Sequence, residues 1–232
     1  MRQLPLGVRL RDTARLESFV PGGNGEVVRL VSGADPHAPR VIWIWGRRGS
    51  GKTHLLQAAC ASIADRGGSA SYLDPAAGAE PGWLEGCENL DLVCVDGLDA
   101  VAADAAWDEA LFRLHALMQD TPARLCVASE RPPAALEFRL PDLRSRLLAA
   151  SVHQLHELDD VGQAQALRLR AALRGLELSA EGALYLMHRL PRDMHTLCAM
   201  LDRLDEASLV AQRRLTVPFL RQALEDQGVG GA

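Results

Sequence analysis

Apolar residues in the first two thirds of the chain form short runs, separated by longer stretches with helical spacing. The runs predict five buried strands, at residues 41–45, 70–73, 90–95, 124–128 and 151–155. The longer stretches predict helices at 52–65, 104–119 and 140–147, and a short one after the Pro-Gly-Gly-Asn turn at 21–24. The glycine- and proline-rich segment 75–86 predicts a loop or a poor helix. Strands that alternate with helices indicate an α/β fold, with a five-stranded parallel sheet covered on both faces.

The pattern changes near residue 158, after which no further strand is predicted. Four segments there have the apolar stripe of amphipathic helices, at 161–173, 180–189, 192–206 and 217–226. We therefore expect a small all-helical domain at 158–232 behind an α/β domain at 13–157. The remaining residues, 1–12, form a flexible segment in this prediction.

That N-terminal segment carries more apolar residues than an exposed terminus normally does. Leu4, Leu6, Val8 and Leu10 alternate with other residues, and Pro5 is among the interruptions. Such a segment either packs on its own domain or inserts its apolar side chains into the groove of a partner.

Composition and charge limit the classes of function. The chain has 232 residues, of which 48% are hydrophobic and 24% charged, with a net charge of −5. An acidic chain argues against a wide DNA-binding surface, which usually carries a basic excess. The five cysteines include no C-x-x-C pair, so we expect free thiols. No signal-peptide core or membrane-length apolar run is present, so a cytoplasmic protein without membrane contact is expected.

The strongest motif is the turn between the first strand and the following helix. Its sequence, GRRGSGKT, fits the phosphate-binding pattern G-x-x-x-x-G-K-[ST] at every fixed position. Lys52 can reach the β- and γ-phosphates, and the Thr53 hydroxyl can hold Mg²⁺. The alternative is a glycine-rich turn that binds nothing, but the strand before it and the helix after it favour a nucleotide site. The predicted nucleotide-binding residues here are Gly46, Arg47, Arg48, Gly49, Ser50, Gly51, Lys52, Thr53 and His54.

Asp96 follows the third predicted strand and can complete a magnesium site with Thr53. The alternative is an aspartate that caps the next turn. In ATPases that hydrolyse well, a second acid usually follows at once and orients the attacking water. Here that position is Gly97, and Asp99 lies too far along the chain to have the same geometry. The sequence thus predicts nucleotide binding with weak hydrolysis, unless Asp99 compensates.

Two further candidate sites lie on later elements of the same domain, a serine after a strand and a group of arginines around a helix. Ser129 follows the fourth strand and either senses the γ-phosphate or is an ordinary strand-end serine. The helix at 140–147 begins at a proline, and arginines lie at 139, 144 and 146. An arginine on such a helix can enter a neighbouring subunit's site and stabilise charge on a transferring phosphoryl group, or it can belong to a solvated basic face.

In this order, the motifs resemble those of the AAA+ ATPases. Gly51–Leu56, and Phe19–Gly22 with Asn24, resemble the initiator DnaA and its relatives. A chain that ends after the helical part, without a basic helix-turn-helix domain, resembles the Hda family of DnaA-homologous regulators. The same resemblance extends to Ser129–Pro133, Leu140–Leu143, Ser145–Leu147 and Ala211–Phe219.

The resemblance implies an AAA+ P-loop domain followed by a helical lid, and it implies partners. Gln3, Leu4, Leu6 and Val8 resemble the peptide that binds the DNA-polymerase sliding clamp (beta subunit). Arg146 is then the finger that acts in trans on the nucleotide of DnaA. The family mechanism is that the clamp-bound regulator stimulates ATP hydrolysis by DnaA and so prevents re-initiation. The regulator itself holds ADP or ATP with Mg²⁺ and reaches DNA only through the clamp; homo-oligomerisation stays open.

One position departs from the family pattern. His195 stands where the lid's sensor arginine is expected, and a neutral histidine lacks the permanent charge of a guanidinium. Either Arg192 reaches the phosphates instead, or the lid contacts the nucleotide more weakly. The competing functions are an autonomous AAA+ ATPase or helicase-loader-type protein, which steady ATP turnover would reveal, and a small-molecule kinase, for which no catalytic acid is evident.

Overall fold

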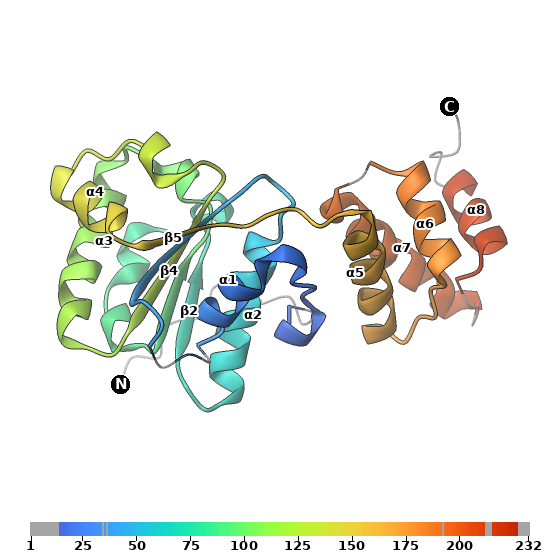
Figure 1. The fold of residues 1–232 in the computed structure, drawn as a ribbon, viewed down its shortest axis with the longest axis horizontal. Coiled ribbons are helices and arrows are strands. Elements are labelled where there is room, and N and C mark those ends of the chain that lie inside the picture. The colour runs from blue at the N-terminus through green and yellow to red at the C-terminus, as the bar shows by residue number, and fades with distance from the viewer. Residues whose placement is uncertain (1–13, 34, 36, 192, 212–214, 227–232) are drawn as a thin grey trace. The chain divides into compact units, whose positions relative to one another are not determined.

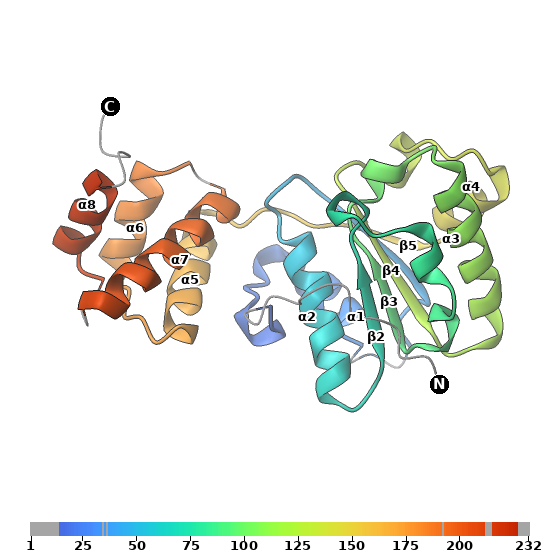
Figure 2. The same cartoon turned by 180° about the vertical axis from the view of Figure 1, so that it is seen from behind.

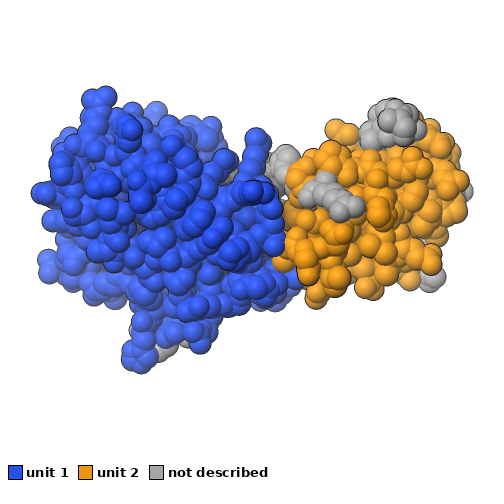
Figure 3. Space-filling view, turned by 45° about the horizontal axis from the view of Figure 1, so that its top comes forward, with its two compact units in different colours: residues 1–157 blue, residues 158–232 orange. Residues whose placement is uncertain are grey.

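The computed structural model divides the chain into two compact units, residues 1–157 and residues 158–232 (Figure 3). The structure describes residues 14–33, 35, 37–191, 193–211 and 215–226. The predicted flexible segment at 1–12 therefore lies outside the described residues.

The first unit is built on a parallel sheet, as predicted. Its strands are β1 (Val41–Trp45), β2 (Ala70–Leu73), β3 (Leu92–Val95), β4 (Arg124–Ser129) and β5 (Ser151–Gln154). Their order across the sheet is β2-β3-β4-β1-β5, and every neighbouring pair is parallel. Because the carboxyl ends of parallel strands meet at one edge, the loop after β1, Asp96 after β3 and Ser129 at the end of β4 are brought to the same edge.

Helices cover both faces of this sheet (Figures 1 and 2). The helices of the first unit are α1 (Gly25–Val31), α2 (Lys52–Asp65), α3 (Ala105–Leu117) and α4 (Pro141–Leu148). Alternate residues of β1 pack on opposite sides: Ile42 and Ile44 join the core beneath α1 and α2, whereas Trp43 joins the core beneath α3 and α4. Both faces of β1 are covered by helices, which explains why its sequence is a continuous apolar run rather than an alternating one.

The segment between β2 and β3 was predicted as a loop or a poor helix, and it contains three short 3-10 helices, at 75–77, 81–84 and 87–89. Asp74 caps the first of them, because its carboxylate accepts hydrogen bonds from the backbone N–H groups of Ala76 and Ala77. Glycine and proline interrupt any longer helix in this stretch.

The second unit is all-helical, as predicted. It contains α5 (Asp160–Leu173), α6 (Ala180–Arg189), α7 (Met194–Ala211) and α8 (Val217–Asp226). Leucines from all four helices form one core, which includes Leu167, Leu186, Leu201 and Leu220. Helix α7 begins two residues later than the predicted 192–206 and continues to residue 211.

All five cysteines are free and buried, which agrees with their predicted role as small apolar residues. Within the described part of the chain, every helix is too short or too polar to span a bilayer.

Candidate functional site

The loop between β1 and α2 has a backbone that requires glycine. Gly49 and Gly51 have φ values of +87° and +98°, a region that other residues adopt only with strain. At Gly46 the requirement is space, since a Cβ there would lie 2.4 Å from the carbonyl oxygen of Leu155. The three glycines let the loop curl closely around the start of α2, which is the geometry of a phosphate cradle.

Lys52 is the first residue of α2 and the only lysine in the chain. The residue is only 9% exposed, and its Nζ donates hydrogen bonds to the carbonyl oxygens of Gly46 (2.7 Å) and Arg47 (2.9 Å). Burial lowers the pKa of this amine, while carboxylates, with Asp96 the largest contributor, oppose that shift. A buried cation at a helix N-terminus is best compensated by an anion such as a phosphate.

Ser50 provides a direct test of whether the loop fits a phosphate. Its hydroxyl oxygen is buried and has no hydrogen-bond partner among the described residues. A buried polar group without a partner is costly, and a phosphate oxygen held in the loop would accept this hydroxyl's hydrogen bond. The loop therefore fits a nucleotide phosphate in shape, charge and hydrogen-bonding capacity.

Asp96 lies at the centre of a buried hydrogen-bonded group beside the loop. Its carboxylate oxygen Oδ2 accepts hydrogen bonds from Thr53 Oγ1 (2.5 Å) and from the hydroxyl of Tyr72 (2.7 Å). Burial raises the pKa of Asp96, a residue that is 5% exposed, and these two hydrogen bonds oppose the shift. Sequence reasoning paired Thr53 with Asp96 but missed Tyr72. The only available signal was its place near the end of the neighbouring strand.

The same pair suits a magnesium ion. The Thr53 hydroxyl and the Asp96 carboxylate supply oxygen ligands, which Mg²⁺ prefers. No cluster of three or more histidine, cysteine, aspartate or glutamate side chains that could hold a metal is found in the described residues. A magnesium ion here would therefore take its remaining ligands from nucleotide phosphates and water, the usual arrangement at phosphate loops.

The position after Asp96 lacks an acid, and the structure shows how the next candidate acid is used. Gly97 has φ +69°, so a side chain there would be strained as well as absent. The Asp99 carboxylate accepts hydrogen bonds from the backbone N–H groups of Glu130 (2.5 Å) and Arg131 (3.3 Å) and from Arg131 Nε (3.2 Å). Asp99 thus holds the end of β4, and these contacts occupy the group that would have to orient an attacking water.

Ser129 is fully buried, and its hydroxyl both accepts and donates within the protein. It accepts a hydrogen bond from Trp43 Nε1 (2.7 Å) and donates one to the carbonyl oxygen of Arg131 (2.6 Å). Its carbonyl oxygen accepts the N–H of Gly46 (3.2 Å), which fixes the start of the phosphate loop. A γ-phosphate contact would have to replace one of the hydroxyl's bonds, so the sensor role stays a prediction.

Arg146 lies on α4, and its described contacts are with α3. Its guanidinium lies over the ring of Phe112, 4.3 Å from the ring centroid, and Nη1 is 3.5 Å from His115 Nδ1. Arginine can only donate, so His115 accepts as a neutral imidazole. Burial, with a smaller contribution from Arg146, lowers the pKa of His115, which favours that neutral form. None of these contacts involves the phosphate loop.

Several solved structures share this fold. Domain III of the replication initiation protein DnaA from Thermotoga maritima is 18% identical, with a TM-score of 0.77 over 94% of this chain and 98% of that one. AMPPCP-bound DnaA from Aquifex aeolicus is 23% identical, with a TM-score of 0.68 over 85% of this chain and 66% of that one. A variant of Thermotoga maritima RuvB is 17% identical, with a TM-score of 0.69 over 96% of this chain and 75% of that one. At these identities the similarity shows the AAA+ fold.

The C-terminal part gives the narrower match. Residues 146–224, which begin at Arg146 and run through most of the helical unit, match the family model described as Hda, lid domain. The chain thus has the AAA+ fold seen in DnaA, and its last third is similar to the lid domain of Hda. The four helices of the second unit correspond to that lid.

The N-terminal part of the chain is joined to the phosphate loop through His54. His54 Nε2 lies 3.0 Å from Ser18 Oγ, and its ring contacts that of Phe19, with the centroids 5.6 Å apart. The Asn24 side chain forms two hydrogen bonds with the backbone of His156, one in each direction, at 2.9 and 2.8 Å. Residues 18–24 thus connect the start of the domain to His54, directly after the phosphate loop, and to His156, shortly before the lid.

Some predicted site residues of the chain lie outside the described residues. They are Gln3, Leu4, Leu6 and Val8 of the N-terminal segment and Arg192 of the lid. His195 falls in the first turn of α7, and its side chain is also outside the described part. The choice between Arg192 and a weakened lid contact therefore stays a prediction.

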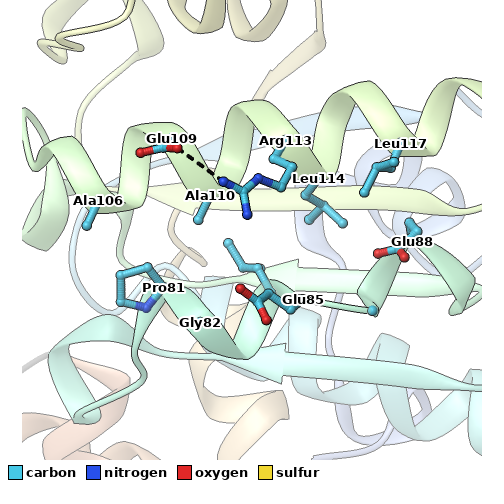
Figure 4. Close-up of a pocket in the computed structure, with 12 residues that line it drawn as sticks. Pro81, Gly82, Glu85, Glu88, Ala106, Glu109, Ala110, Arg113, Leu114 and Leu117 are labelled. Carbon is cyan, nitrogen blue, oxygen red and sulfur yellow. Dashed lines mark hydrogen bonds and ion pairs between the residues drawn. The ribbon is translucent and has the colours of Figure 1, made fainter.

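The chain also has a groove of about 280 Å³ between α3 and the 3-10 segment before β3 (Figure 4). Leu84, Leu114 and Leu117 supply apolar lining, and Glu85 and Glu88 lie on the side opposite α3. The sequence patterns gave no sign of this groove, because it forms only when these two segments pack together.

Proposed function

We propose that this chain is a nucleotide-binding regulator of the initiation of DNA replication. Bound to the sliding clamp on DNA, it stimulates ATP hydrolysis by DnaA and so prevents re-initiation. The Hda-type lid and the DnaA-like fold support a role as a DnaA-related regulator. The observation that carries the proposal is a glycine-rich loop suited to a phosphate, beside which the position after Asp96 is Gly97 and the carboxylate of Asp99 is bonded to the end of β4.

The chain's own nucleotide is, in this proposal, a structural ligand. Lys52, the Ser50 hydroxyl and the start of α2 hold the phosphates, and Thr53 and Asp96 hold Mg²⁺. AMPPCP-bound DnaA, a structural neighbour, supports an adenine nucleotide. We propose ADP as the resting nucleotide, because the resemblance to the Hda family implies it. A site without a water-orienting acid retains its nucleotide rather than turning it over.

Arg146 is, in this proposal, the residue that acts on the partner. A guanidinium keeps its charge at every physiological pH and can donate to two phosphate oxygens at once, so it suits the stabilisation of a phosphoryl transition state. Its contacts lie on α3, away from this chain's phosphate loop. That placement favours action on another protein's nucleotide over action on its own.

DNA contact is indirect in this proposal. The net charge of −5 does not favour a surface that grips the phosphate backbone. The clamp supplies the attachment, and the proposed clamp ligands are Gln3, Leu4, Leu6 and Val8 at the N-terminus.

The decisive experiment mixes ATP-bound DnaA, clamp-loaded DNA and this protein, and measures ATP hydrolysis. We expect stimulation by the wild-type protein and a loss of about 10³-fold in the catalysed rate for Arg146→Ala, the lower end for a trans-acting arginine. Arg144→Ala, an exposed arginine on the same helix, is the matched control and should keep full stimulation. Stimulation that survives in Arg146→Ala contradicts the finger role, and steady turnover by the protein alone supports an autonomous ATPase.

A further inference from the structure

Tyr72 contacts the metal-binding carboxylate from a neighbouring strand. Strands β2 and β3 pair in register, with Tyr72 opposite Cys94 and Leu73 opposite Val95. The N–H of Asp96 donates to the carbonyl oxygen of Leu73 (2.8 Å), so the pairing continues to the carboxylate itself. This register carries the Tyr72 hydroxyl to within 2.7 Å of Asp96 Oδ2. The contact is therefore fixed by the sheet rather than by a mobile loop.

The two hydroxyl groups around Asp96 donate to the same oxygen. Thr53 and Tyr72 both donate to Oδ2. When Thr53 donates its proton to the carboxylate, the lone pairs of its oxygen are left to face a cation. With Oδ2 occupied by two donors, the carboxylate cannot rotate freely, and Oδ1 is held in one direction.

Helix α2 also lies beside Tyr72. Burial raises the pKa of Tyr72, and the buried side chain of Gln57 on α2 opposes that rise, so Gln57 lies near the hydroxyl. Gln57 lies four residues after Thr53, so both side chains leave the same face of the helix. One helix face thus contacts Asp96 through Thr53 and places Gln57 near Tyr72.

We propose that Tyr72 is a positioning residue for magnesium: its hydroxyl fixes the Asp96 carboxylate in the orientation that receives the ion. The proposal rests on the nucleotide site of the proposed function. It predicts that Tyr72 affects nucleotide affinity only when magnesium is present. A tyrosine that merely fills space in the core would affect affinity equally with and without the ion.

The experiment uses the full-length protein with Tyr72→Phe, which removes one oxygen atom and keeps the ring. Tyr185→Phe, which alters the chain's only other tyrosine, is the matched control, because Tyr185 lies in the lid helix α6. Affinity for a fluorescent ADP analogue is measured in magnesium and in EDTA. We expect Tyr72→Phe to reduce the gain in affinity from magnesium about 10-fold, the size of one hydrogen bond to a charged group. Affinity in EDTA should stay within about twofold of wild type.

A second variant guards against misfolding of the first. Gln57→Leu keeps the tyrosine and removes the amide near its hydroxyl, and we expect a smaller loss in the affinity gained from magnesium. An unchanged gain from magnesium in Tyr72→Phe, or an equal loss in EDTA, overturns the positioning role alone. Wild-type protein that binds ADP in neither condition overturns the proposed function and this inference together.

Discussion

At the scale of residues, two buried groups of opposite charge lie at the same edge of the sheet. Burial lowers the pKa of Lys52 and raises that of Asp96, so each group is driven toward its neutral form. The attraction between the Lys52 ammonium and the Asp96 carboxylate opposes both pKa shifts only in part. An anionic nucleotide with Mg²⁺ would favour the charged form of each, because phosphates approach the amine and the cation approaches the carboxylate. The residues are thus arranged for a ligand that carries both charges.

The single lysine makes nucleotide occupancy directly measurable. Amine-reactive acetylation can modify only Lys52 and the α-amino group of the chain, since every other basic side chain is arginine or histidine. The lowered pKa of Lys52 gives it a larger neutral, reactive fraction near pH 8 than an ordinary lysine has. We expect saturating ADP with magnesium to slow acetylation of Lys52 at least about 10-fold, because a bound phosphate blocks the amine and restores its charge.

Mass spectrometry of the peptide that contains Lys52 measures this protection. The α-amino group is an internal control, and its rate should not change with ADP. Equal acetylation of Lys52 with and without ADP would mean that the loop does not hold the nucleotide's phosphates.

At the scale of elements, α3 forms the seat of the proposed finger. Phe112 and His115 project from α3 toward Arg146 on α4 and hold the guanidinium by a cation–π contact and a weak hydrogen bond. A free arginine side chain has many rotamers. The contacts with Phe112 and His115 already restrict them, so less conformational entropy is lost when Arg146 enters a partner's site. The element pair therefore pre-organises the residue that the proposed function depends on.

Removing the ring should weaken stimulation without affecting nucleotide binding. A cation–π contact contributes about 0.5–2 kcal/mol, so we expect Phe112→Leu to reduce stimulated hydrolysis by DnaA about 2- to 30-fold. Leu117→Ala, a half-exposed residue on the same helix, is the control and should keep stimulation. A Phe112→Leu protein with full stimulation would show that the seat does not position Arg146. The hydrolysis assay reports both variants, and ADP affinity checks that the site is intact.

Sequence patterns predicted the elements that depend on local spacing. The five strands, the glycine-rich loop and the four lid helices all follow from apolar periodicity and from residues with special backbone requirements. The irregular segment before β3 was predicted only as a poor helix or loop, because the 3-10 helices at 81–84 and 87–89 show no side-chain cap comparable to Asp74. The start of α7 lies two residues after the predicted one because Asp193 caps the helix, its carboxylate accepting the backbone N–H of Thr196 (2.8 Å).

Contacts between distant segments could not be predicted in the same way. The role of Tyr72 depends on β2 lying beside β3, and that order is a property of the whole sheet. Asp99 was a candidate acid in the sequence, but its three hydrogen bonds to the end of β4 appear only once β3 and β4 are paired. The seat of Arg146 likewise depends on how α3 packs against α4. The local residue types and the Thr53–Asp96 pair were therefore predictable, whereas the contacts of Tyr72, Asp99 and Arg146 were not.

At the scale of the whole molecule, binding and catalysis are assigned to different proteins. This chain supplies a nucleotide-holding domain, an Hda-type lid and an arginine, whereas the hydrolysed ATP belongs to DnaA in our proposal. Such a division requires a means of bringing the two proteins together on DNA. In our proposal the clamp performs that task, since the acidic net charge does not favour direct DNA binding, and the N-terminal segment is the proposed point of attachment.

This division predicts that attachment and nucleotide binding can be separated by mutation. Gln3→Ala combined with Leu4→Ala removes the proposed clamp ligands and leaves residues 14 onward unchanged, so the thermal melting temperature and ADP affinity should match those of wild type. Binding to the isolated clamp should fall at least about 100-fold, because two anchoring side chains of a short peptide carry most of its binding energy. Stimulation of DnaA should be lost on clamp-loaded DNA. As a matched control, Arg11→Ala alters the same segment beyond the proposed motif and should keep clamp binding. Wild-type clamp affinity in the double variant would place the attachment elsewhere in the chain and leave the catalytic role of Arg146 to be judged on its own assay.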